Sequence, residues 1–333
     1  MAKRPRTALI TGASTGIGRT TALHLDRLGM RVFATVRREE DADSLRRDAS
    51  DRLRPLFLDV TDGESIAATV DAVTRAVGDA GLDGLVNNAG IAVGGPLELL
   101  PIDAFRRQFE VNVVGQLAVT QAVMPAIRRA RGRIVNVGSV AGRATLPLVG
   151  AYAASKHALE AMTDALRMEL RHWGVQVAIV EPGAVRTPIW ERSVAAVERM
   201  LARLPERARA LYGPLIDGIM EFALRSAETG IPPERVAKAI EHALTAARPR
   251  TRYLIGRDAR VRALLQMLPD RLRDRIITAQ LRRLTRSSGG AGSAGRRREP
   301  GTNAVTAESG DTAGARDGGR SGETANGAAR GRD

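Results

Sequence analysis

The chain has 333 residues, of which 44% are hydrophobic and 26% charged, so it can bury a sizeable core and is neither fibrous nor wholly disordered. It has no cysteine, which excludes disulfides, thiolate catalysis and cysteine-ligated metals, and its 4 histidines lack ligand spacing, so no metal is expected. The formal net charge is +14, with 12 basic and 3 acidic residues between Arg248 and Arg286.

Short β-branched runs alternate with helical patterns from Thr7 to about Thr251. The predicted strands are Thr7–Thr11, Arg31–Thr35, Pro55–Asp59, Leu82–Asn87, Arg133–Val137, Val175–Val180 and Arg252–Ile255. The helical patterns between them include Gly18–Leu28, Ser65–Val77, Ile102–Arg129 and Ala151–Trp173. This alternation predicts an α/β fold of the doubly wound type, with a parallel sheet of about seven strands and helices on both faces.

A glycine-rich turn follows the first predicted strand, with the spacing Gly-x-x-x-Gly-x-Gly. Glycines let backbone N–H groups approach a pyrophosphate, and the N-terminus of the following helix adds a positive dipole end. An ordinary strand-to-helix turn is the alternative, but a position ahead of several strand–helix units favours a dinucleotide site. The predicted loop residues are Gly12, Ser14, Thr15, Gly16, Ile17 and Gly18.

The end of the second strand bears on cofactor choice. An NAD site usually has an acid there that binds the ribose hydroxyls, whereas this chain has Arg37 and Arg38, with no acid before Glu39. A guanidinium can bind the 2′-phosphate of NADP, and Ser14 can add a hydrogen bond. NADP(H) is therefore favoured and NAD(H) is the alternative, unless these arginines only cover a solvated edge.

Two further loops are expected beside the cofactor. Asp59 and Val60 follow the third strand and are predicted to line the adenine pocket. Asn88, Ala89 and Gly90 follow the fourth strand. Ligands of such folds bind at the carboxyl ends of the strands, although a plain turn would have the same composition.

The candidate chemistry lies after the fifth strand. Ser139 follows that strand, and Tyr152 and Lys156 occupy positions i and i+4, which share one face of a helix. A nearby ammonium favours the phenolate, which would move the pKa of a tyrosine from about 10 toward the working range of a general acid or base. Asn112 is predicted to hold a water that relays the proton. A serine hydrolase is disfavoured, because Ser139 lacks the glycine two residues later that a nucleophile elbow uses.

Together these motifs resemble the short-chain dehydrogenase/reductase family over roughly residues 5–257. The glycine loop, the Asn-Asn-Ala-Gly motif and the tetrad Asn112, Ser139, Tyr152 and Lys156 carry the resemblance. The sequence around Tyr152 and the Ala34-Thr35-Val36-Arg37 pattern look most like the retinol and 17-beta-hydroxysteroid dehydrogenase branch. The family's contacts to the nicotinamide half of the cofactor match Pro182, Gly183, Val185 and Thr187.

The resemblance implies a Rossmann-type oxidoreductase that interconverts an apolar alcohol and its ketone or aldehyde by hydride transfer. Tyr152 would be the general acid and base, and Lys156 would lower its pKa and bind the nicotinamide ribose. Two rival functions stay open. One is a non-catalytic NADP-binding sensor or scaffold, and the other is a 3-ketoacyl-thioester reductase that docks an acidic carrier protein.

The C-terminal part departs from the compact family pattern. The expected organisation is a catalytic domain over 1–257 that includes a helical substrate lid at 188–230, then a basic amphipathic helical extension at 258–286. The Gly/Ala/Ser/Arg-rich tail 287–333 is predicted to be disordered. The extension would either pack on the body or a subunit partner, or contact an anionic membrane surface.

The remaining expectations concern partners and location. A homo-oligomer, dimer or tetramer, is expected from the family resemblance. No nucleic-acid partner is expected, because no aromatic platform accompanies the basic residues. The N-terminal apolar run stops at Thr11-Gly12, too short for an export signal, so a cytoplasmic location is predicted, with membrane association as an addition.

Overall fold

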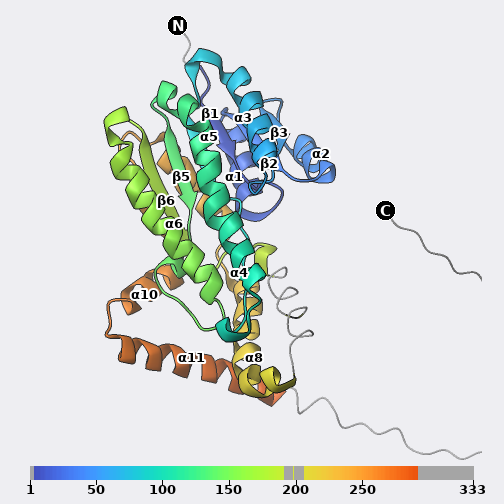
Figure 1. Ribbon diagram of the computed structural model, residues 1–333, viewed down its shortest axis with the longest axis vertical. Coiled ribbons are helices and arrows are strands. Elements are labelled where there is room, and N and C mark those ends of the chain that lie inside the picture. Colours follow the sequence, from blue (N-terminus) through green and yellow to red (C-terminus); the bar gives the residue numbers. More distant parts are fainter. Residues whose placement is uncertain (1–3, 191–197, 199–205, 292–333) are drawn as a thin grey trace, which may run out of the picture. The chain divides into compact units, whose positions relative to one another are not determined.

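The computed structural model describes residues 4–190, 198 and 206–291. Its centre is a seven-stranded parallel sheet in the order β3-β2-β1-β4-β5-β6-β7. Figure 1 shows this sheet with helices packed around it. The strands are β1 Thr7–Ile10, β2 Arg31–Val36, β3 Leu53–Phe57, β4 Gly84–Asn87, β5 Arg133–Val137, β6 Gln176–Pro182 and β7 Arg252–Ile255. The predicted doubly wound α/β fold is confirmed.

Helices cover both faces of the sheet. One face carries α1 (Gly16–Arg27), α2 (Glu39–Asp48) and α9 (Pro233–Thr245), and the other carries α3 (Gly63–Val77), α5 (Gly115–Ala130) and α6 (Gly150–Glu169). In β1, Ala8 and Ile10 face the first layer, whereas Leu9 faces the second. This strand is hydrophobic at successive positions because it is buried on both sides.

The strand order places the functional loops together. From β1 the chain goes outward to β2 and β3, then returns to add β4 on the other side of β1. Such a reversal opens a crevice at the carboxyl ends of the two central strands, where ligands bind in this class of fold. The loops after β1 and β4 border this crevice.

The helix predicted over Ile102–Arg129 is interrupted. The chain forms α4 (Ile102–Phe109), then a π-helical turn at Glu110–Val114, and only then α5. A π-helical turn changes the angular spacing of side chains and is frequent at functional sites. Asn112 lies within it. The segment predicted as Ala151–Trp173 likewise divides into α6 and a 3₁₀ turn at Arg171–Trp173.

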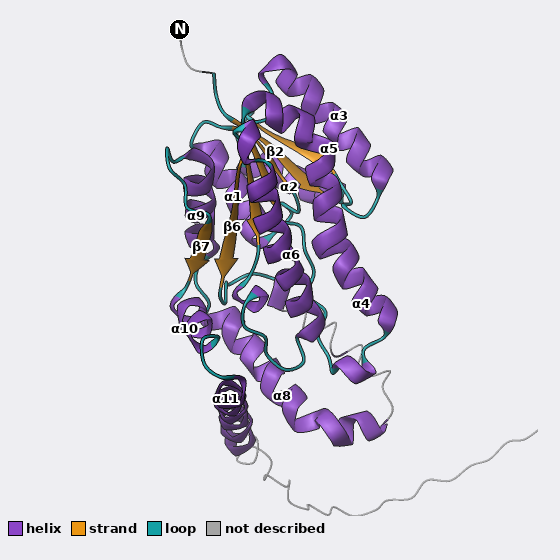
Figure 2. Ribbon diagram, turned by 60° about the vertical axis from the view of Figure 1, so that its left-hand side comes forward, coloured by secondary structure: helices purple, strands orange, loops and turns teal. Residues whose placement is uncertain are grey.

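Three further helices lie near the C-terminal end of the described chain. The helix α8 (Glu206–Thr229) precedes β7, and α10 (Arg257–Leu265) and α11 (Asp270–Ala291) follow it. Figure 2 shows α10 next to the end of β7, and α11 packs against α8. Leu281 of α11 is buried in a cluster with Leu148, Ile216 and Ile219. Thus the described extension packs on the body.

One face of the extension remains uncovered. Its exposed apolar side chains are Val261, Leu264, Met267, Leu272 and Ile276, so membrane contact stays a prediction. No helix among the described residues is long and apolar enough to cross a bilayer. The predicted lid includes 191–197 and 199–205, which lie outside the described residues. Residues 287–291 continue α11 rather than starting the predicted tail, and the rest of that tail, 292–333, also lies outside the description.

Candidate active site

A cavity of about 950 Å³ lies at the carboxyl ends of the strands. Its walls come from the loops after β1, β2, β3, β4, β5 and β6, together with α6, α8 and α10. It brings together the predicted loop residues Gly12, Ser14, Thr15, Gly16 and Ile17 with Ser139, Tyr152 and Lys156. Gly18 and Asn112 do not line it.

The loops after β1 and β4 are joined by hydrogen bonds. Thr11 Oγ1 accepts from the backbone N–H groups of Asn88 and Ala89, both at 2.9 Å. The Asn88 side-chain amide donates in return to the carbonyls of Thr11 and Gly12, also at 2.9 Å. This exchange fixes the floor of the cavity. Thr11 was not predicted as a site residue, although its position directly before Gly12 was the available signal.

The glycines of the loop after β1 let the protein backbone come close to a ligand. Gly12 and Gly16 have φ of +68° and +57°, which other residues rarely adopt. A Cβ at Gly18 would lie 2.3 Å from the Gly12 carbonyl oxygen, so Gly18 is needed for the turn itself. No side chain caps the N-terminus of α1, which leaves its N–H groups for an anion. These features fit the pyrophosphate of a dinucleotide.

Arg37 and Arg38 line the far end of the cavity. Arg37 Nη1 lies 4.0 Å from Asp59 Oδ2, and the Arg37 side chain is 67% exposed, so its guanidinium is free to reorient toward a phosphate. Hydrogen bonds from Thr61, assisted by Arg37, lower the pKa of Asp59. Val60 lines the same end.

Ser139, Tyr152 and Lys156 form the polar wall of the cavity. The Ser139 side chain acts to lower the pKa of the Tyr152 hydroxyl, and Ser139 Oγ accepts a hydrogen bond from the Ala141 N–H at 3.1 Å. Lys156 Nζ donates to the Val137 carbonyl at 2.7 Å and lies 5.9 Å from the centroid of the Tyr152 ring. The i, i+4 spacing on α6 therefore brings both side chains to one cavity, as the sequence indicates.

The electrostatics of Tyr152 differ from the sequence-based argument. Burial raises the pKa of Tyr152 and outweighs the hydrogen bond from Ser139 and the charge of Arg262, which act to lower it. Burial also lowers the pKa of Lys156 to about 8, opposed by Glu160. In the protein alone, the pKa of Tyr152 is therefore raised and not lowered as the sequence predicted, because desolvation is the larger effect. The phenol is protonated at neutral pH, which suits donation of a proton.

Asn112 is buried in a polar cluster behind the site. Its Oδ1 accepts from the Ile91 N–H at 2.9 Å, and its Nδ2 donates to the Ile91 carbonyl and to Ser155 Oγ. Gln108 makes a parallel set, since it binds Val93 N–H, the Ile91 carbonyl and Ser155 Oγ. Gln108 and Ser155 were missed because no motif marks them.

The loop after β6 lines another part of the cavity. Pro182, Gly183, Val185 and Thr187 all line the cavity, and Thr187 Cγ2 lies 3.1 Å from the place of a Cβ on Gly16. Asp258 of α10 accepts a hydrogen bond from the Ala184 N–H at 2.7 Å. A side chain at Gly183 would collide with that carboxylate. The C-terminal extension is therefore attached to the site, through a contact that sequence patterns did not indicate.

A second wall of the cavity is apolar. It is formed by Leu146, Leu148, Val149, Trp190, Ile216, Ile219, Met220 and Phe222. Most of these belong to the described part of the predicted lid. Trp190 is held by a hydrogen bond from its Nε1 to the Val185 carbonyl at 2.8 Å.

Comparison with known proteins agrees with this geometry. A family model described as short chain dehydrogenase matches residues 6–198. The chain belongs to the short-chain dehydrogenase/reductase family. It is 41% identical over 278 residues to 17-beta-hydroxysteroid dehydrogenase type 6 of Bos taurus and, over the same length, to retinol dehydrogenase 5 of Homo sapiens, covering 81% of this chain and 86% of each relative. The predicted branch and the assignment as a dehydrogenase are confirmed.

Solved structures of this family share the fold. A short-chain dehydrogenase from Streptomyces avermitilis superposes with a TM-score of 0.67 at 28% identity, covering 89% of this chain and all of that one. One from Burkholderia cenocepacia, in complex with NADP, gives 0.62 at 26% identity and covers 84% of this chain and 98% of that one. This short-chain dehydrogenase is therefore an oxidoreductase whose fold binds NAD(P).

Proposed function

We propose that this protein is an NADP(H)-dependent oxidoreductase that interconverts an apolar alcohol and its ketone or aldehyde. The observation that carries the proposal is one cavity with two unlike walls. Ser139, Tyr152 and Lys156 form the polar wall, and side chains from the β5 loop and α8 form the apolar wall. A carbonyl group on an apolar body fits between these walls.

The residues divide the chemistry of carbonyl reduction. The bound cofactor supplies the hydride for the carbonyl carbon. The Ser139 and Tyr152 hydroxyls hold the carbonyl oxygen, and Tyr152 donates its proton to that oxygen as negative charge develops there. Lys156 stabilises the resulting tyrosinate by its charge. In oxidation the same groups act in reverse, with Tyr152 as the base.

Cofactor choice is proposed from Arg37 and Arg38. Both line the end of the cavity where the adenosine part would lie, and no acid occupies the end of β2. A guanidinium there attracts the 2′-phosphate of NADP, whereas an acid would attract the ribose hydroxyls of NAD. Ser14 lies at the same part of the cavity and can add a donor.

The substrate class is proposed from the apolar wall and the relatives. Their printed names refer to a hydroxysteroid and to retinol, and this chain is about equally similar to both. We take from them only the shared character, an apolar molecule with a hydroxyl group. Water exclusion by the described part of the lid would suit hydride transfer.

The same proposal includes the organisation expected from the sequence. The catalytic domain comprises 1–257, the extension 258–286, and the chain forms a cytoplasmic homo-oligomer. The exposed apolar residues of α10 and α11 are the part that would touch a membrane or a second subunit.

A fluorescence titration with NADPH and NADH, followed by turnover assays on steroid, retinoid and aliphatic ketones, tests the function. We expect tighter binding of NADPH and turnover of at least one apolar ketone. Binding without turnover on any substrate class would favour the sensor. Turnover of 3-ketoacyl thioesters but not of free apolar ketones would favour the thioester reductase. No binding of either cofactor would contradict the whole proposal.

A further inference from the structure

A second cavity of about 530 Å³ adjoins the first. Four residues line both, namely Leu146, Ala184, Phe222 and Arg262. The second cavity lies among α8, α9, α10 and α11, so the C-terminal extension forms much of it. Among these four shared residues, Arg262 is the charged one, so it lies at the junction between the active-site cavity and this outer cavity.

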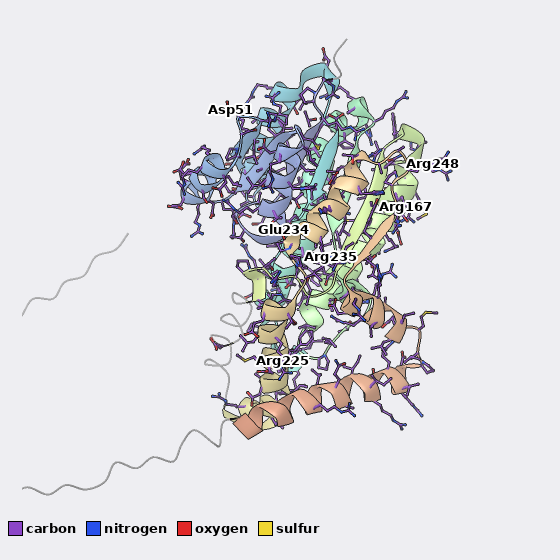
Figure 3. The ribbon with its side chains drawn as sticks, turned by 180° about the vertical axis from the view of Figure 1, so that it is seen from behind. Asp51, Arg167, Arg225, Glu234, Arg235 and Arg248 are labelled. Carbon is purple, nitrogen blue, oxygen red and sulfur yellow. The ribbon has the colours of Figure 1, made fainter. Side chains whose placement is uncertain are left out.

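The outer cavity combines apolar surface with positive charge. Its arginines are Arg225, Arg235, Arg257, Arg262 and Arg273, and the one acid in its described lining is Asp258. Arg225 comes from α8 and Arg235 from the start of α9, as Figure 3 shows. Asp258 is occupied by the Ala184 N–H, and Arg273 is paired with Asp270. Arg225 is paired with Glu221 at 2.6 Å, so Arg235, Arg257 and Arg262 supply the positive charge that can attract an anion.

Arg262 is the cation best placed for a ligand. Its Nη2 donates to the Ala144 carbonyl at 2.7 Å, which fixes the guanidinium at the junction. Its Nε–H is buried and has no acceptor. Burial lowers the pKa of Arg262, with Asp258 and Tyr152 opposing, but an arginine stays charged at neutral pH. A buried donor of a cation is costly to leave without an acceptor, and an anion would supply one.

We infer that the natural substrate is an amphiphile, an apolar alcohol or ketone that carries a carboxylate, and that Arg262 binds this carboxylate. A carboxylate accepts two parallel hydrogen bonds from a guanidinium, a geometry that a neutral polar group cannot reproduce. Arg262 and Tyr152 line the same cavity, so one substrate can place its carboxylate at Arg262 and its carbonyl at Tyr152. The apolar body then occupies the cavity against Phe222. This inference rests on the proposed function for the reaction but not for the binding.

Binding is tested first, without turnover. The chain has 2 tryptophans, and Trp190 lines the cavity, so a Trp173→Phe background leaves a reporter at the site. Fluorescence is titrated with dodecanoate and with 1-dodecanol. We expect Arg262→Gln to weaken dodecanoate binding about 10- to 100-fold and to leave the alcohol less affected. Arg262→Lys should restore part of the loss. Arg260→Gln, an exposed site on the same helix that lines neither cavity, is the control.

Turnover separates this inference from the proposed function. The substrates are oxododecanoates with the ketone at successive positions, each compared with its methyl ester. We expect the acid-to-ester ratio of kcat/KM to fall about 10- to 100-fold in Arg262→Gln, a ratio that cancels any effect on Tyr152. Turnover of the esters with no preference for acids would overturn the inference and leave the function standing. Arg262-dependent binding of dodecanoate without turnover of any ketone would support the inference and contradict the proposed function. Equal loss of dodecanoate and dodecanol binding would also overturn the inference.

Discussion

At the scale of single residues, the site places a tyrosine between opposing effects. Desolvation raises the pKa of Tyr152, while Ser139 and Arg262 lower it. Lys156 is buried as well, with a pKa near 8, so its ammonium loses its proton just above neutral pH. The protein therefore keeps the phenol protonated and holds a nearby cation only up to mildly alkaline pH. Carbonyl reduction should accordingly decline as the pH rises through 8.

Arg37→Asp tests whether Arg37 binds the 2′-phosphate of NADP. We expect NADPH to bind about 10- to 100-fold more weakly, because one charge-assisted hydrogen bond is lost and a like charge is added. NADH binding should change much less. Isothermal titration with both cofactors measures the difference. Arg47→Asp, an exposed position on α2 outside the cavity, changes the net charge equally and should have little effect. Equal losses for NADPH and NADH would contradict the role of Arg37.

At the scale of elements, α6 carries more than the catalytic pair. Tyr152, Lys156, Glu160 and Asp164 recur at intervals of four residues along one face. Arg252 of β7 bonds Glu160, and it lies 3.0 Å from Glu181 and 2.6 Å from Asp164. Glu181 directly precedes Pro182 and also pairs with Arg143 at 2.6 Å. This network fixes α6, the end of β6 and the β5 loop relative to one another, so its members are positioning residues.

Glu160→Gln should change how stability depends on pH. Burial and the neighbouring Glu181 raise the pKa of Glu160 from 4.5 to about 7. Between these values the folded chain holds a proton that the unfolded chain has released, so the unfolding free energy falls as the pH rises. The variant should lose this slope, by about 1–2 kcal/mol after screening by solvent. Arg252 keeps Glu181 and Asp164 as partners.

Denaturant unfolding at pH 5.0 and pH 7.5 measures the effect. Glu169→Gln, an exposed position on the same helix, should keep the slope of the wild type. Parallel pH profiles for Glu160→Gln and the wild type would show that Glu160 titrates as in the unfolded chain.

At the scale of the whole molecule, the C-terminal helices complete the active site. Asp258 is attached to the β6 loop, Arg262 reaches the active-site cavity, and Leu281 of α11 packs with α8. The apolar wall of the cavity is therefore supported from outside by α11. Loss of this packing should loosen substrate binding as well as the fold.

Leu281→Ala tests that support. Leu281 is 5% exposed, whereas Leu272 on the same helix is 47% exposed. We expect Leu281→Ala to lower the unfolding free energy by about 2–3 kcal/mol, through lost transfer energy and the cavity it leaves. Leu272→Ala should cost far less. Thermal and denaturant unfolding of both variants measure the two losses of unfolding free energy. Similar small losses for Leu281→Ala and Leu272→Ala would mean that α11 does not pack stably.

The limits of sequence-based prediction follow the range of the contacts. The parallel sheet, the glycine loop and the pairing of Tyr152 with Lys156 depend on neighbours in the chain, so periodicity and spacing could indicate them. Arg262, Asp258 and Gln108 reach the site through packing of distant segments, and no local pattern marks them. The π-helical turn at Asn112 was missed because its apolar pattern also fits an α-helix. The direction of the pKa shift at Tyr152 depends on burial, which spacing does not reveal.

The most direct test of hydride transfer assisted by Tyr152 is a single-turnover measurement with Tyr152→Phe. NADPH is bound first, and its fluorescence is then followed after an apolar ketone is added. The account predicts unchanged NADPH affinity and a rate of hydride transfer lowered about 10²- to 10⁴-fold, the range for loss of a general acid. Tyr212→Phe, on α8 and outside the active-site lining, should match the wild type. A Tyr152→Phe variant with wild-type hydride transfer would contradict the account.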